Sequence, residues 1–268
     1  MSLKNILIIS LVVFATQSCS QYQKLLKSTD PELKYNKAVE YFDKKDFMRA
    51  TTLFEEVQNY FKGTDRSETL LNYLANAYLG QKDYYTAQDY FRAYTRTYPK
   101  GKFIQDVKFK IAYCYYLQSP DPRLDQTATG QAIEAFQEFI DFYPENERVP
   151  EAVKLQDEMS NKMSYKELLN ARLYYNLGNY LGNNYESAVI TAGNVLKKYP
   201  ANKYREELSF IVVDGKYQQA LNSFEMRKAD RFRNTIDECY SFLNEFPSSK
   251  YKKQIDKILQ ASKQAVGE

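Results

Sequence analysis

The stretch LNYLANAYLGQKDYYTAQDYFRAYTRTYPK, residues 71–100, decides the fold class of this 268-residue chain. Its apolar residues recur three or four positions apart, which places them on one face of each of two successive helices. They are Leu71, Leu74, Ala75 and Tyr78 in the first helix and Ala87, Phe91 and Tyr94 in the second. Gln81-Lys82-Asp83 predicts a polar turn between the helices, and Pro99 ends the second helix because proline cannot continue it.

The same pattern recurs along the chain. Three copies are Ala38-x-x-Tyr41 with Ala50-x-x-x-Phe54, Ala75-x-x-Tyr78 with Ala87-x-x-x-Phe91, and Ala112-x-x-Tyr115 with Ala132-x-x-x-Phe136. An aromatic residue followed by proline ends four of the copies, at Tyr98-Pro99, Tyr143-Pro144, Tyr199-Pro200 and Phe246-Pro247. A single pair cannot bury its apolar faces, so each pair must be covered by the next. The spacing resembles the tetratricopeptide repeat. It predicts an all-α, right-handed superhelical stack of about five such helix pairs with a C-terminal capping helix.

The later copies are less regular. Prolines and small polar residues predict a loop over residues 118–130 inside the third copy, where long loops are often functional and disorder is an equal alternative. Copy four begins at Ala171-x-x-Tyr174 and copy five spans Glu206 to Pro247. A last helix over Tyr251–Ala265 carries several lysines; a polar cap explains them first, and a basic docking surface is the alternative.

Composition excludes several classes of function. The chain has no histidine, and none of its three cysteines forms a C-x-x-C pair, so we expect neither a metal nor a cofactor beyond a covalent lipid. Cys114 and Cys239 lie in apolar helical pattern and are expected to be buried. The net charge of +3 is spread among acids and bases, so no nucleic-acid partner is expected.

We expect no enzymatic activity. A glycan hydrolase is the alternative, because paired carboxylates could act across a cleft of roughly 5–10 Å. However, the pairs Glu55-Glu56, Glu206-Glu207 and Asp237-Glu238 are adjacent in helical pattern, so their members point in different directions.

The first 18 residues predict a signal peptide. Lys4 precedes an apolar run from Ile6 to Ala15, which is too short to span a bilayer, and a short polar segment leads to Cys19. This boundary resembles a bacterial lipobox, which implies cleavage before Cys19 and acyl chains such as palmitate on that cysteine. Residues 19–30 would then form a lipidated tether, and Ser20 favours the outer membrane, facing the periplasm. An ordinary secretory signal is the alternative.

Two segments narrow the field further. They are Tyr35–Phe42 and Ser119-Pro120…Leu124-Asp125-Gln126-Thr127…Ala132-Ile133-x-Ala135-Phe136-x-x-Phe139-Ile140-x-x-Tyr143-Pro144. Both resemble the BamD family of the outer-membrane β-barrel assembly machinery. The resemblance implies a lipoprotein on the inner leaflet of the outer membrane. It would bind the periplasmic domains of a BamA-like barrel protein and other assembly subunits, and help receive and insert unfolded outer-membrane proteins.

The resemblance also implies a division of labour. Residues 31–153, with repeats one to three, would recognise substrate, and residues 154–268, with repeats four and five and the cap, would hold the partner. Thr191 stands where family members carry an arginine that contacts BamA, so no residue is assigned to that interface. The alternative function is another periplasmic repeat lipoprotein that acts as an envelope or cell-division scaffold.

The repeat pattern predicts which residues face a peptide-binding groove on the first helix of each pair. They are Tyr35, Val39, Phe42, Asn72, Asn76, Leu79, Phe109, Tyr113 and Tyr116. The asparagines offer donors and acceptors to a peptide backbone, and the aromatic residues offer apolar faces. The alternative is that the aromatic residues pack against adjacent repeats and the asparagines face water.

Overall fold

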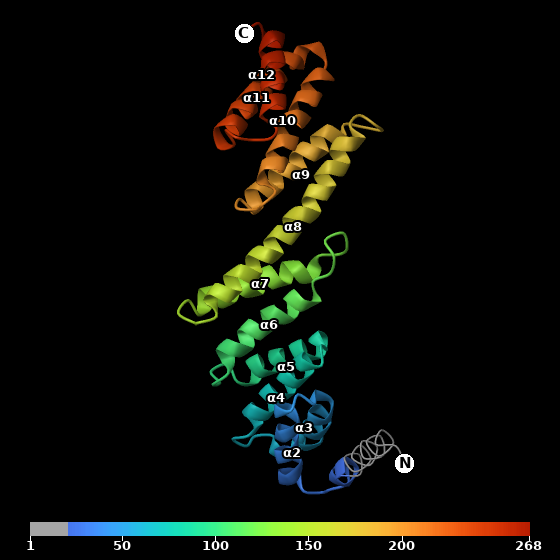
Figure 1. Ribbon diagram of the computed structural model, residues 1–268, viewed down its shortest axis with the longest axis vertical. Coiled ribbons are helices and arrows are strands. Elements are labelled where there is room, and N and C mark those ends of the chain that lie inside the picture. Colours follow the sequence, from blue (N-terminus) through green and yellow to red (C-terminus); the bar gives the residue numbers. More distant parts are fainter. Residues whose placement is uncertain (1–20) are drawn as a thin grey trace, which may run out of the picture. The chain divides into compact units, whose positions relative to one another are not determined.

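The computed structural model describes residues 21–268, and this part of the chain contains helices and no strand (Figure 1). The helices are α2 (Pro31–Asp43), α3 (Phe47–Phe61), α4 (Ser67–Gly80), α5 (Tyr84–Thr97), α6 (Ile104–Gln118), α7 (Thr127–Phe142), α8 (Val149–Leu177), α9 (Asn184–Lys198), α10 (Arg205–Leu221), α11 (Glu225–Glu245) and α12 (Lys252–Val266). The expected succession of five helix pairs and a last helix is confirmed. The predicted signal peptide and Cys19 lie outside the described residues.

The described chain forms two compact units. The first comprises residues up to 118 together with 135–149, and the second comprises 119–134 and 150–268. The division expected between residues 153 and 154 falls inside α8, which runs unbroken for 29 residues. Its only proline, Pro150, occupies the first turn, where the missing N–H is tolerated, and no glycine follows until Gly178.

Two turns of the first unit share one mechanism. Lys45 and Lys82 follow α2 and α4 with φ of 60° and 65°, in the left-handed region. In the first turn the Asp46 amide donates to the Tyr41 carbonyl at 2.9 Å, and an equivalent bond closes the second. This is the Schellman motif, which satisfies carbonyls at a helix end and reverses the chain. The polar turn predicted at Gln81-Lys82-Asp83 is therefore confirmed.

The aromatic-proline positions end the second helix of several pairs. Tyr98, Tyr199 and Phe246 each cap a helix with φ between −129° and −125°. Each backbone amide donates to the carbonyl four residues earlier at 2.8 Å. The proline that follows has no N–H to extend the ladder, so the helix stops there.

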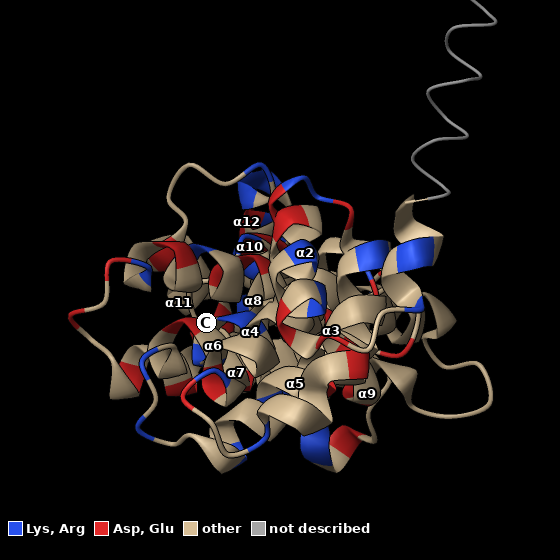
Figure 2. Ribbon diagram, turned by 90° about the horizontal axis from the view of Figure 1, so that it is seen from below, with Lys and Arg blue, Asp and Glu red and all other residues tan. Residues whose placement is uncertain are grey.

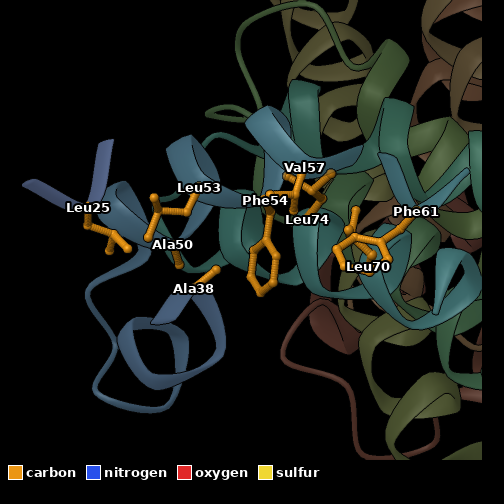
Figure 3. Close-up of a cluster of buried hydrophobic side chains, with 9 residues drawn as sticks. All are labelled: Leu25, Ala38, Ala50, Leu53, Phe54, Val57, Phe61, Leu70 and Leu74. Carbon is orange, nitrogen blue, oxygen red and sulfur yellow. The ribbon is translucent and has the colours of Figure 1, made fainter. Parts of the chain in front are cut away.

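Buried apolar side chains of the N-terminal segment, α2, α3 and α4 form one cluster (Figure 3). Ala38 and Ala50 are fully buried and face each other between α2 and α3, where a larger side chain would separate the helices. Phe54 fills the space next to them and stacks on Tyr73 of α4 at 5.3 Å. The remaining members of the cluster are Leu25, Leu53, Val57, Phe61, Leu70 and Leu74.

Hydrogen bonds between consecutive pairs repeat with the same sequence separation. The side-chain amide of Gln81 donates to the Phe47 carbonyl, and the side-chain amide of Gln118 donates to the Tyr84 carbonyl. Both bonds join residues 34 positions apart, at N···O distances of 3.3 and 3.5 Å. The C-terminal ends of α4 and α6 are thus tied to the starts of α3 and α5, the second helices of the preceding pairs.

Residues 21–26, expected as part of a tether, are helical and packed onto the first pair. Leu25 is buried in the cluster of Figure 3, and Tyr22 and Leu26 pack against it. The Lys34 ammonium also donates to the Leu26 carbonyl at 3.0 Å. The chain just after Cys19 is therefore joined to the repeats by a folded contact.

The loop expected over residues 118–130 is shorter than predicted. α6 ends at Gln118 and α7 begins at Thr127, whose backbone amide donates to the Asp125 carboxylate at 2.9 Å. α8 fixes the loop from one side: the Lys162 ammonium donates to Ser119 Oγ at 2.7 Å, and the Lys166 ammonium donates to the Leu124 carbonyl at 3.0 Å. Burial lowers the pKa of Lys162.

In the second unit, α8, α9 and α10 share a core of small and aliphatic residues. They include Leu168, Ala171, Ala188, Ala192 and Leu208. The buried Asp214 carboxylate of α10 accepts hydrogen bonds from Tyr175 of α8 at 2.5 Å and from Gln254 of α12 at 3.4 Å. The pKa of Tyr175 is raised mainly by burial and to a smaller extent by its hydrogen bond to Asp214.

α12 covers the last pair, as expected of a cap. Ile255 and Ile258 of α12 are buried against Cys239 and Phe242 of α11. Cys239 and Cys114 are both unbridged and fully buried, which confirms the expectation that they act as small apolar residues. Burial raises the pKa of each thiol to about 12, so both remain protonated.

The charged residues are distributed as the composition suggested. Lys and Arg are interspersed with Asp and Glu along the helices (Figure 2). No helix among residues 21–268 combines the length and the apolar character needed to cross a bilayer.

The left-handed turn residue yields a first prediction. Replacing Lys45 with glycine should raise the free energy of unfolding by about 0.5–1 kcal/mol, because glycine adopts positive φ without a steric penalty. The matched control is Lys44→Gly, one residue earlier, where φ is −80° and glycine only adds freedom to the unfolded chain. Urea unfolding of both variants measures the difference. Equal destabilisation by the two would contradict this account.

The turn after α5 yields a second prediction. A Cβ on Gly101 would lie inside van der Waals contact with Tyr94 Oη and Glu68 Oε1, which are hydrogen-bonded to each other, and 2.9 Å from Tyr98 Cβ. Gly101→Ala should therefore lower the free energy of unfolding by about 2 kcal/mol. Gly193→Ala in α9 is the control, because no atom beyond the nearby backbone of its own helix lies within 4 Å of the new methyl group. It should stabilise the chain by up to about 1 kcal/mol.

Candidate functional site

All nine residues predicted to line a peptide groove lie in the first unit, on the first helices of the first three pairs. α2 carries Tyr35, Val39 and Phe42; α4 carries Asn72, Asn76 and Leu79; α6 carries Phe109, Tyr113 and Tyr116. Eight of them are half-buried, and Phe109 is completely buried.

The residues of α2 pack mainly against the neighbouring helices. The Tyr35 ring meets Phe54 and Phe61 edge-on at 5.9 and 5.3 Å. The Phe42 ring contacts Tyr73 of the next pair at 4.9 Å, and Val39 packs against the same cluster. At α2 the packing described by the alternative interpretation is therefore present, with only part of each side chain left exposed.

The asparagines of α4 are linked to each other and to α6. The Asn76 amide donates to the Asn72 carbonyl at 2.7 Å and to the Asn72 side-chain oxygen at 3.0 Å. The Asn76 side-chain oxygen accepts from the Lys110 ammonium at 2.6 Å. Leu79 packs against the core of the second pair. The asparagines are thus held in a defined orientation by intramolecular bonds.

Phe109 is a correction to the predicted groove. Its ring lies between Phe136 and Phe139 of α7 at 5.7 and 5.5 Å and exposes no surface. The reason is its position three residues before Ala112, on the same helical face as that buried alanine. Tyr113 and Tyr116 continue outward from it as a stack, with 5.7 Å between their rings.

A chain of polar contacts crosses the same helices and was not predicted. The Lys110 ammonium, which bonds Asn76, also bonds the Asp106 carboxylate at 2.6 Å. Arg148, in the segment after α7, donates to the other Asp106 oxygen at 3.1 Å and lies 3.5 Å above the Phe109 ring. We call Asn72, Asn76, Asp106, Lys110 and Arg148 the polar chain. The i,i+4 spacing of Asp106 and Lys110 signals one of its links, whereas nothing in the sequence points to Arg148.

The polar chain and the tyrosine stack offer what an extended peptide requires. Amide, ammonium, guanidinium and carboxylate groups can pair with main-chain donors and acceptors, and the half-buried rings of Tyr113 and Tyr116 can pack on side chains. The side chains of Asp106 and Arg148 keep 39% and 31% of their surface exposed. The arrangement is therefore accessible and oriented.

The adjacent carboxylates Glu55 and Glu56 diverge as expected. Glu55 accepts from Tyr78 and Tyr90, whereas Glu56 pairs with Lys34. Residues 21–268 contain no group of three metal-ligating side chains of the His, Cys, Asp or Glu type. In the second unit, Thr191 lines a small cavity of about 300 Å³ with neighbouring residues of α8 and α9.

Comparison with known proteins identifies the family. A family model described as an outer membrane lipoprotein, YfiO, matches residues 27–182 and 177–267. The outer membrane protein assembly factor BamD of Caulobacter vibrioides is 25% identical over 71% of the chain, a match that spans 61% of that protein, less than two thirds. A putative BamD of Aquifex aeolicus is 24% identical over 83% of the chain and 71% of its own length.

The structure of a complex of the TPR2AB domain of yeast Sti1 aligns with 87% of this chain and covers 98% of the Sti1 chain, at 13% sequence identity. Its TM-score of 0.41 is too low to support an argument about the fold. The sequence matches extend over nearly all of the described residues and confirm the resemblance noted from the repeats. The chain belongs to the YfiO (BamD) family of outer membrane lipoproteins.

Proposed function

We propose that this chain is a non-enzymatic scaffold for the assembly of β-barrel proteins in the outer membrane. It is anchored by lipid on Cys19 and faces the periplasm. Its helix pairs bind the periplasmic domains of a BamA-like barrel protein and receive unfolded barrel proteins. The family match over residues 27–267 carries this proposal, together with two relatives named as BamD assembly factors.

The first unit suits the reception of substrate. Its polar chain crosses from α4 to α6 and the segment after α7, beside the stacked rings of Tyr113 and Tyr116. Side chains that are already oriented lose little further entropy when a ligand binds. An extended, unfolded segment with exposed backbone groups and aromatic side chains fits this surface.

The second unit suits a folded partner. Large apolar side chains are exposed at two of its turns: Tyr180 and Leu181 between α8 and α9, and Phe224 and Met226 at the start of α11. Leu181, Phe224 and Met226 are 87% exposed or more. The corresponding turns of the first two pairs are polar, Lys44-Lys45-Asp46 and Gln81-Lys82-Asp83. Exposed aromatic residues and methionine are typical of the central residues of protein interfaces.

Crosslinking tests the substrate surface. Photoreactive residues placed at Asn72 and Tyr113 should capture a nascent barrel protein in intact cells, because Asn72 belongs to the polar chain and Tyr113 to the tyrosine stack. Probes at Tyr60 and Tyr85, exposed on the second helices α3 and α5, serve as controls. Capture by the control positions alone would show that substrate does not bind this surface.

Co-purification tests the partner surface. After gentle solubilisation of membranes, the chain should co-purify with a barrel protein that carries periplasmic domains. A Phe224→Ser/Met226→Ser variant should recover at least about tenfold less of that barrel protein. Tyr60→Ser, which removes an exposed aromatic residue of the first unit, should recover the normal amount. Recovery of cell-division or envelope-growth proteins in place of a barrel protein would favour the alternative scaffold and contradict the proposal.

A further inference from the structure

A pocket of about 780 Å³ opens between the helical residues 21–26, α2 and the beginning of α3. It lies entirely within the first unit, away from the polar chain. Gln21, Lys24 and Leu25 form the wall contributed by the N-terminal segment. Since Leu25 is buried against α2 and α3, this wall is held in place.

The pocket carries an excess of positive charge. Its lining residues include four cations and two carboxylates. The cations are Lys24, Lys37, Lys44 and Arg49, and the carboxylates are Glu40 and Asp46. The Lys37 ammonium is bonded to Glu40 at 2.9 Å, and the Arg49 guanidinium is bonded to Asp46 at 3.0 Å. Lys24 and Lys44 are exposed and take part in neither of these two ion pairs, so their ammonium groups can reach a ligand.

Arg49 is held by aromatic rings. Its guanidinium carbon lies 5.2 Å from the ring centroid of Tyr22 and 5.5 Å from that of Tyr41. The two rings meet edge-on at 5.8 Å. Cation–π contacts of this kind fix a long side chain in one orientation, so the pocket is preorganised on this side.

Covalent geometry indicates the ligand. Gln21, which lines the pocket, follows Cys19 by two residues. Consecutive Cα atoms are about 3.8 Å apart, so the two Cα atoms are at most about 8 Å from each other. Once Cys19 is inserted in a bilayer by its acyl chains, the nearest ligands to the pocket are the headgroups of neighbouring lipids.

We propose that this pocket binds the phosphate of an anionic phospholipid headgroup such as phosphatidylglycerol, with Lys24 and Lys44 as its principal cations. The inference rests on the lipid anchor of the proposed function. Acyl chains alone leave an anchored protein free to rotate, whereas a second, electrostatic contact on the rigid N-terminal helix orients the first unit on the membrane.

The test uses the mature chain with Cys19→Ser, which is soluble and unlipidated in every arm. Co-sedimentation with vesicles of equal parts phosphatidylcholine and phosphatidylglycerol is compared with pure phosphatidylcholine vesicles. Calorimetry with inorganic phosphate and with a short-chain phosphatidylglycerol separates a free anion from a lipid headgroup. The variant Lys24→Gln/Lys44→Gln is matched by Lys62→Gln/Lys100→Gln, which removes two exposed lysines elsewhere in the first unit.

We expect binding to the anionic vesicles and to short-chain phosphatidylglycerol, weakened roughly tenfold or more in the pocket variant and much less in the control. Equal loss in both variants, no preference for anionic vesicles, or phosphate binding as tight as lipid binding would each overturn the inference. Co-purification with a barrel protein is measured separately. A negative result in the vesicle experiment therefore does not contradict the proposed function, and a negative co-purification does not contradict lipid binding by the pocket.

Discussion

Close approach of helices at buried alanines is the constraint on which the rest of the structure depends. Ala38 and Ala50 are fully buried in the first pair, and Ala75 and Ala87 occupy the equivalent places in the second. Since alanine has no side-chain rotamers to lose, this contact costs little entropy. Larger neighbours such as Phe54 and Phe91 are also fully buried and fill the adjoining space. Around this contact, the first unit repeats the same left-handed turn after α2 and α4 and the same type of hydrogen bond between consecutive pairs.

The repeats differ where function is proposed. The turns within the first two pairs, after α2 and α4, are polar Schellman motifs. The polar chain joins the second pair to the third, and the third pair also carries the tyrosine stack. The fourth and fifth pairs expose apolar residues at their turns. A regular scaffold thus carries distinct surfaces at different positions along one chain, as repeat proteins commonly do.

Much of the fold followed from the sequence because the signals are local. Alanine and aromatic spacing predicted the helix pairs, and the Tyr98-Pro99 type of end predicted where they stop. Predictions failed where tertiary contacts decide. Phe109 was placed in a groove but is enclosed by α7, and the burial of Leu25, within the tether expected over residues 19–30, was not foreseen. The contact of Arg148 with Asp106 joins residues 42 apart, beyond the reach of any periodic pattern.

The central claim is that the chain serves barrel assembly, and depletion tests it most directly. Folded barrel proteins in the outer membrane are measured by their heat-modifiable migration on gels as the chain is depleted, with an unrelated outer membrane lipoprotein as internal standard. The account predicts that folded barrel proteins fall steeply while the standard stays constant. Normal levels of folded barrel proteins in fully depleted cells would contradict it.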